Sequence, residues 1–167
     1  MKYWTETNLP VNELRARAMR YFGQEAAPDM ALVRREPNRL LFSDPFGDLV
    51  VRVDAGRPNI VSVVTSHWHA QAQEFVKNRA EAMAGVIHIE AETDRPPAEV
   101  LRRARDFFAE ELGLSLAAEQ GQSLAFTGGG GQVTVAVMGN GQPRLQVSAR
   151  AWDHQAEEFV RQLTTEH

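Results

Sequence analysis

The sequence predicts an α+β fold in which an internally duplicated β-α-β4-α unit forms one curved antiparallel sheet with helices on one face. Segments 67–76 and 151–160 agree at six of ten positions at a fixed spacing of 84 residues. At a spacing of 86, further identities are Glu13/Glu99, Arg17/Arg103, Ala18/Ala104 and Phe22/Phe108. A duplication of this extent predicts repeat one over residues 1–84 and repeat two over residues 85–167, in a single pseudo-symmetric domain.

The first repeat opens with a predicted strand over residues 2–6. Asn8 and Pro10 then supply a capping residue and a proline tolerated in a first helical turn. A helix ending near Gly23 is indicated by apolar residues at i, i+4, i+7 and i+8, namely Leu14, Ala18, Tyr21 and Phe22. Turn compositions then separate four strands, near 30–35, 39–43, 48–54 and 59–65. A second helix repeats the spacing with Trp68, Ala72, Phe75 and Val76.

The second repeat follows the same order. Its strand is Val86–Glu92, and Asp94 and Pro96 take the places of Asn8 and Pro10. The helical stripe is Val100, Ala104, Phe107 and Phe108, and four strands are expected near 115–119, 122–127, 132–138 and 143–150. A last helix carries Trp152, Ala156, Phe159, Val160 and Leu163. The change of spacing from 86 to 84 indicates a two-residue deletion in a loop, where length changes are tolerated.

This doubled order of elements resembles the architecture of the TATA-box-binding protein family. The resemblance covers almost the whole chain, but it is one of topology and not of sequence motif. It implies a curved antiparallel sheet with helices on the convex side and a pseudo-twofold axis between the halves. The family kinks DNA with phenylalanines inserted between bases, whereas the hairpins here offer only Phe46. The resemblance therefore implies a fold and does not by itself imply a function.

Charge and composition restrict the function classes. The net charge is −4, with 11 basic and 10 acidic residues in 1–84 and 7 basic and 12 acidic residues in 85–167. A nucleic-acid-binding protein normally has the opposite sign, so nucleic acid is an unfavoured partner. No apolar run approaches the roughly 18 residues of a membrane span, and the N-terminus lacks a signal-like apolar stretch, which favours a soluble cytoplasmic protein. The absence of cysteine excludes disulfides and thiolate chemistry.

Strand alternation assigns the two faces of the sheet. The face toward the helices is apolar in both repeats and comprises Leu40, Phe42, Leu49, Val51, Val53, Val61, Val63, Leu124, Phe126, Val133, Val135, Val137, Leu145 and Val147. The opposite face is mixed and carries Ser62 together with an apolar set of Leu41, Val50, Ile60, Val64 and Met138. An apolar patch of this size on a monomer tends to mark an interaction site.

The predicted ligand-binding residues lie on this second face and are Arg39, Arg52, Arg144, Arg150, Met138, Ile60, His88 and Trp4. Arginines around apolar residues suit an anionic, partly apolar ligand or an acidic partner segment. The leading hypothesis is a non-enzymatic binding or interaction module for a small ligand or protein partner, or one that self-associates as a homodimer. The alternatives are nucleic-acid binding by fold analogy, and a small hydrolase or isomerase that uses His88 with Glu90 or an arginine. No catalytic residue is assigned.

Three further motifs have structural interpretations. His67 and His69 are two apart at a helix start and would diverge on a helix, so no metal site and no cofactor are predicted. The glycine run 128–131 precedes a strand and not a helix, which indicates a flexible hairpin instead of a phosphate loop. Trp68 and Trp152 occur in both repeats, which indicates a scaffold role at the helix starts.

Overall fold

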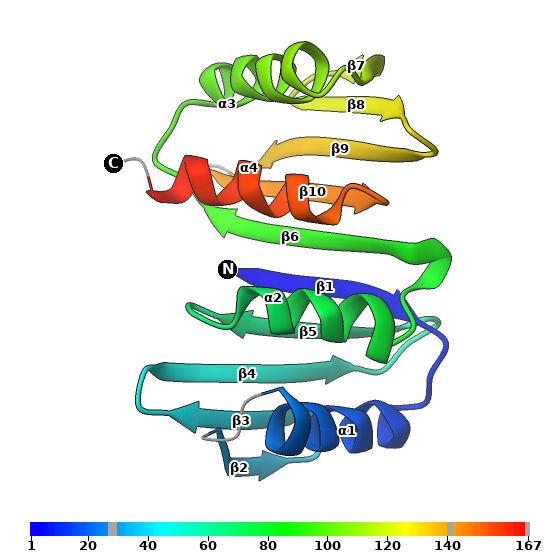
Figure 1. Cartoon of the computed structure of the whole chain (residues 1–167), viewed down its shortest axis with the longest axis vertical. Coiled ribbons are helices and arrows are strands. Elements are labelled where there is room, and N and C mark those ends of the chain that lie inside the picture. The colour runs from blue at the N-terminus through cyan, green and yellow to red at the C-terminus, as the bar shows by residue number, and fades with distance from the viewer. Residues whose placement is uncertain (27–29, 140–141, 166–167) are drawn as a thin grey trace. The chain divides into compact units, whose positions relative to one another are not determined.

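The computed structural model describes residues 1–26, 30–139 and 142–165, and the chain divides into two compact units, Met1–Ile87 (unit 1) and His88–His167 (unit 2). One strand, a helix, four strands and a second helix follow one another twice along the chain. In each unit the helices lie on one face of an antiparallel sheet (Figure 1). The predicted α+β fold class is therefore confirmed. No helix of the described ranges is both long and apolar enough to cross a bilayer.

Unit 1 contains β1 (Lys2–Thr7), α1 (Val11–Arg20), β2 (Ala31–Glu36), β3 (Arg39–Asp44), β4 (Gly47–Asp54), β5 (Asn59–Thr65) and α2 (His69–Glu74). Its strands are ordered β2-β3-β4-β5-β1, and every neighbouring pair is antiparallel. The helix predicted to end near Gly23 continues past α1 as a π-helical turn over Tyr21–Glu25, and α2 continues in the same way over Phe75–Arg79.

Unit 2 contains most of β6 (Val86–Glu92), which begins two residues before the unit boundary. It also contains α3 (Pro97–Ala104), β7 (Ser115–Gln120), β8 (Ser123–Gly128), β9 (Gly131–Met138), β10 (Arg144–Arg150) and α4 (Asp153–Thr165). The order is β6-β10-β9-β8-β7. The edge strands β2 and β7 carry register shifts between Leu32 and Arg34 and between Leu116 and Ala118. Such bulges at equivalent places twist an edge and discourage further strand pairing.

The predicted core faces are confirmed. All fourteen strand residues assigned to the helix side are buried, with exposed fractions between 0% and 5%. The period of two in the strands explains this success, because one apolar residue in two is enough to specify a buried face.

The predicted helix caps are wrong. No side chain makes a capping bond at the start of α1 or α3, since the prolines two residues after Asn8 and Asp94 occupy the cap positions. The buried hydroxyls of Thr7 and Thr93 instead accept hydrogen bonds from the backbone N–H two residues ahead, at 3.1 and 3.2 Å. These threonines therefore shape the strand-to-helix turn in both units.

Each unit is built around a cluster of aromatic rings. The ring of Phe22, in the π-helical turn, lies 5.1 Å from that of Phe75 and 5.7 Å from that of Phe42 on β3, measured between centroids. The equivalent rings of unit 2 are Phe108, Phe159 and Phe126. Their separations are 5.2 and 5.4 Å. Tilted rings at these distances attract one another beyond the burial of their surface.

Phe75→Ala and Phe159→Ala should each lower the free energy of unfolding by about 3 to 5 kcal/mol, because each removes a fully buried ring from one of these clusters. Phe46→Ala is the matched control, since Phe46 is 75% exposed, and should change it by less than about 0.5 kcal/mol. Thermal or urea unfolding measures all three. Losses below about 1 kcal/mol at both buried sites would contradict the assignment.

Candidate functional site

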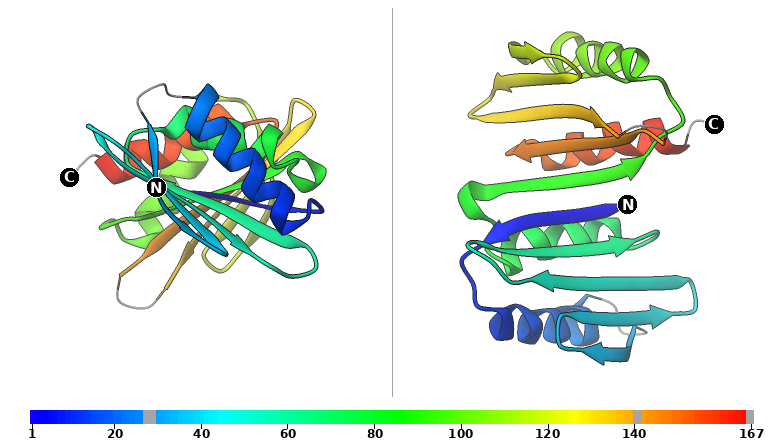
Figure 2. Two further views of the ribbon diagram at one scale, coloured as in Figure 1. Left: turned by 90° about the horizontal axis from the view of Figure 1, so that it is seen from below. Right: turned by 180° about the vertical axis from the view of Figure 1, so that it is seen from behind.

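The strands of each unit present a face that the helices leave uncovered, seen from behind in Figure 2 (right). The predicted binding residues divide between the two units. Those in unit 1 are Trp4, Arg39, Arg52 and Ile60, and those in unit 2 are His88, Met138, Arg144 and Arg150.

In unit 1 the strand register aligns three of the predicted residues in one row. Trp4 of β1 is opposite Ser62, and Ser62 is opposite Arg52. Arg52 is in turn opposite Arg39, so the row crosses four strands, or about 14 Å. Ser62 is only 3% exposed, contrary to the prediction that it faces solvent, because it is a small side chain between longer ones. Ile60 lies half-buried in the neighbouring row.

The two arginines of this row form a like-charge pair across the β3–β4 ladder. Arg52 Nε lies 3.0 Å from Asp54 Oδ1, with both side chains largely solvated. Within the described residues Arg39 makes no hydrogen bond or ion pair, and it is exposed. Like charges directly opposite each other destabilise an antiparallel pair, and one exposed ion pair compensates little. The arrangement therefore favours an anion on this face.

An apolar row runs beside the arginine row. Leu41, Val50 and Val64 are directly opposite one another on β3, β4 and β5. Val64 is 46% exposed, and the other two are half-buried. Lys2 is opposite Val64 at one end of the row, and Arg34 is opposite Leu41 at the other. We call these two rows together the unit 1 open face.

The predicted residues of unit 2 have polar surroundings. His88 Nδ1 lies 2.6 Å from Ser148 Oγ. Arg144 is opposite Met138, which is 42% exposed, and its Nη2 lies 3.6 Å from Glu90 Oε2. The contact between His88 and Ser148 joins two strands that are far apart in the sequence, and alternation alone could not have revealed it.

Unit 2 has no apolar row equivalent to that of unit 1. At the 84-residue spacing, the positions of Leu41, Val50 and Val64 are taken by Ala125, Thr134 and Ser148. Arg150 is exposed at the far end of β10 from Arg144, opposite Gln132. The two predicted arginines of unit 2 therefore do not form a pair like that of unit 1.

Both ring nitrogens of His69 contact other groups of the protein. His69 Nδ1 lies 2.9 Å from the hydroxyl oxygen of Tyr3, and Nε2 lies 3.1 Å from the carbonyl oxygen of Ser66. Over residues 1–26, 30–139 and 142–165, no group of three or more histidine, aspartate or glutamate side chains is arranged to hold a metal ion.

The glycine run of unit 2 is shaped by Trp152. The indole Nε1 of Trp152 donates a hydrogen bond to the carbonyl oxygen of Gly128 at 2.9 Å. A Cβ at Gly129 would lie 2.8 Å from the indole, and one at Gly131 would collide with the carbonyl oxygen of Arg150. The run therefore permits close packing of the tryptophan, a role that the sequence did not reveal.

Trp68 of unit 1 lacks the equivalent bond. Its Nε1 is buried and has no hydrogen-bond partner among the described residues. The equivalent loop is closed instead by Asp44, whose Oδ1 accepts the backbone N–H groups of Phe46 and Gly47 at 2.8 and 2.9 Å. A loop with three fewer glycines thus leaves the indole donor unsatisfied.

Comparison with known proteins yields structural likeness alone. No protein-family model matches the chain, and no curated protein matches it. Similar solved structures include DynU16, from the dynemicin biosynthetic locus, with 13% identity, a TM-score of 0.30 and coverage of 99% of this chain and 94% of that one. The di-domain ARO/CYC BexL, from the BE-7585A biosynthetic pathway, has 10% identity, a TM-score of 0.25 and coverage of 98% and 92%. Likeness at this level assigns no function to the chain.

Trp152→Phe should lower the free energy of unfolding by about 1 kcal/mol more than Trp68→Phe, because only Trp152 donates a hydrogen bond that the change removes. Both changes delete the same atoms, so the difference between them isolates the bond. Urea unfolding of the two variants measures it. Equal losses would show that the indole donor of Trp152 contributes nothing.

Proposed function

We propose that the protein is a non-enzymatic binding module whose unit 1 open face holds an anionic group attached to an apolar body. The observation that carries the proposal is the opposed pair Arg39 and Arg52 beside the row of Leu41, Val50 and Val64. The arginines supply the contact for the anion, and the row supplies the contact for the apolar body.

The chemistry of the two rows is complementary. Guanidinium groups donate paired, charge-assisted hydrogen bonds to carboxylate, sulfonate or phosphate oxygens. An anion between Arg39 and Arg52 would relieve their repulsion across the ladder. A ligand that covers the exposed surface of Val64 binds more favourably, by about 25 cal/mol for each Å² of apolar area removed from water. A ligand with both features engages both rows at once.

A suitable probe is 8-anilinonaphthalene-1-sulfonate, which joins one sulfonate to an aromatic body. Arg39→Ala and Arg52→Ala should each weaken its affinity about three- to tenfold, because each removes one charge-assisted contact. The free energy of unfolding should stay within about 0.5 kcal/mol of wild type, as is usual for exposed positions. Fluorescence titration and urea unfolding provide the two measurements.

Two controls define the outcome of this titration. Arg57→Ala removes an exposed arginine from the β4–β5 loop and should leave the affinity unchanged. N-phenyl-1-naphthylamine, which lacks the sulfonate, should not distinguish the arginine variants from wild type. Unchanged sulfonate affinity in both Arg39→Ala and Arg52→Ala would refute the proposal. A wild-type dimer in sedimentation that Arg52→Ala dissociates would identify a second copy as the occupant.

The resemblance to the TATA-box-binding protein family raises a competing function that salt dependence can test. Phosphate contacts release counterions, so the affinity of a DNA-binding protein falls steeply as salt rises. With a net charge of −4, we expect no such binding to duplex DNA in a fluorescence titration at 50 to 200 mM salt. Micromolar or tighter, strongly salt-dependent affinity would replace the binding-module proposal with a nucleic-acid function.

A further inference from the structure

A groove on the helix side, between the first helix and the second, differs between the two units. In unit 1 the side chain of Arg79 fills it. The guanidinium carbon of Arg79 lies 5.0 Å from the centroid of the Tyr21 ring. Its Nη1 is 3.1 Å from Glu25, and its Nε is 3.8 Å from Glu74. A cleft of about 130 Å³ remains there.

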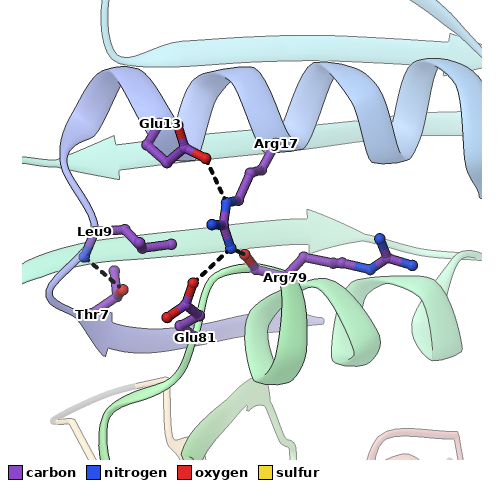
Figure 3. A network of polar contacts seen from close by, with 6 residues as sticks. All are labelled: Thr7, Leu9, Glu13, Arg17, Arg79 and Glu81. Carbon is purple, nitrogen blue, oxygen red and sulfur yellow. Dashed lines mark hydrogen bonds and ion pairs between the residues drawn. The ribbon is translucent and has the colours of Figure 1, made fainter.

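The backbone of Arg79 is fixed by a second arginine. Arg17 Nη1 donates to the carbonyl oxygen of Arg79 at 2.9 Å, and the same guanidinium pairs with Glu13 and Glu81 at 2.8 Å each (Figure 3). The Arg79 side chain therefore starts from an anchored position and extends over Tyr21. Burial raises the pKa of Tyr21, so this ring stays uncharged beneath the cation.

Unit 2 has residues of the same kind around this groove, but it has no arginine at the position of Arg79. At the spacings of the two helices, Phe107 takes the place of Tyr21, Glu111 that of Glu25 and Glu158 that of Glu74. Leu163 takes the place of Arg79. The Phe107 ring lies 5.8 Å from Phe159 at an interplanar angle of 31°, against 6.0 Å and 33° for the equivalent pair in unit 1. The aromatic floor of the groove is therefore the same in both units.

The groove of unit 2 is larger and carries carboxylates available for a ligand. Its volume is about 280 Å³, and Phe107, Leu163, Asp106 and Glu111 all line it. Within the described ranges Asp106 and Glu111 make no hydrogen bond or ion pair, and both are exposed. Arginines 102 and 103 also line the groove, and Arg103 lies 3.4 Å from Glu99. Free carboxylates over an aromatic floor suit a guanidinium group.

We propose that this groove of unit 2 binds an arginine side chain presented by a partner peptide, in the position that Arg79 occupies in unit 1. The guanidinium lies over Phe107 and pairs with Glu111, while its aliphatic stem lies along the groove beside the exposed Gln162. Residues 85–167 contain 12 acidic and 7 basic residues, and this net negative charge attracts a basic segment. This inference is separate from the proposed function, which concerns the open face of the other unit.

The probe for the test is N-acetyl-arginine amide, and N-acetyl-citrulline amide is its uncharged counterpart. In a ¹H–¹⁵N NMR titration the arginine compound should shift the backbone signals of Phe107, Glu111 and Leu163, with a dissociation constant in the millimolar range. Citrulline has the same length without the charge and should bind at least tenfold more weakly. Equal affinity for the two compounds would overturn the proposal.

Substitutions in the two grooves test the proposal from the side of the protein, with the same arginine compound as the probe. Glu111→Gln should weaken the binding of the arginine compound at least tenfold, whereas the control Glu110→Gln, at an exposed carboxylate that does not line the groove, should keep it. Arg79→Leu should empty the groove of unit 1 and add a second set of shifts at Tyr21 and Glu25. A folded Glu111→Gln variant, verified by circular dichroism, that binds the arginine compound as wild type does would overturn the proposal even if Arg79→Leu failed to fold.

Discussion

The contact between the aromatic pair of the first helix and the phenylalanine of the second helix is the constraint on which each unit depends. Phe22 and Phe75 in unit 1, and Phe108 and Phe159 in unit 2, bring their rings to within 0.1 Å of the same separation. The same rings reach a phenylalanine on the strand that follows the edge strand, so one cluster positions both helices against the sheet. Packing of this density tolerates little change, which explains why the phenylalanines of the cluster recur in both units.

Features that depend on the period of the sequence, such as the buried face of a strand, were predicted correctly. Features that depend on strand register or on the geometry of neighbouring side chains were not. All fourteen strand residues that alternation assigned to the core are buried, because burial of a strand face needs no knowledge of which strands pair. Tyr3, Ile87 and Ile89 are also buried but were not assigned to the core. Alternation placed Arg39 and Arg52 on one face but could not show that they are directly opposite, since that depends on register. Alternation predicted that Ser62 faces solvent, but this residue is buried, because the exposure of a small side chain depends on the length of its neighbours. Asn8 was a plausible cap, but no side chain caps this helix, and Thr7 instead accepts the backbone N–H of Leu9 in the turn before it.

Differences between the two units are informative because their scaffolds agree. Equivalent positions in like surroundings should accept the same residues if folding alone acted on them. The apolar row of unit 1 is replaced by small and polar residues in unit 2, and Arg79 is replaced by Leu163. The first difference creates an apolar surface that folding does not require, and the second empties a groove that an internal cation fills elsewhere. Both sites proposed for binding lie at positions where the sequences of the two units differ.

Two costs to folding in unit 1 have no counterpart at the equivalent positions of unit 2. The opposed arginines of unit 1 correspond in unit 2 to Ser123 and Ala136, which are directly opposite each other without repulsion. The buried indole donor of unit 1 has no partner among the described residues, whereas that of Trp152 is satisfied. A buried donor without a partner costs about 1 to 3 kcal/mol, and a like-charge pair adds a smaller amount. Unit 2 shows that the same fold can avoid both costs. The retention of the opposed arginines in unit 1 supports a role for its open face that folding does not explain.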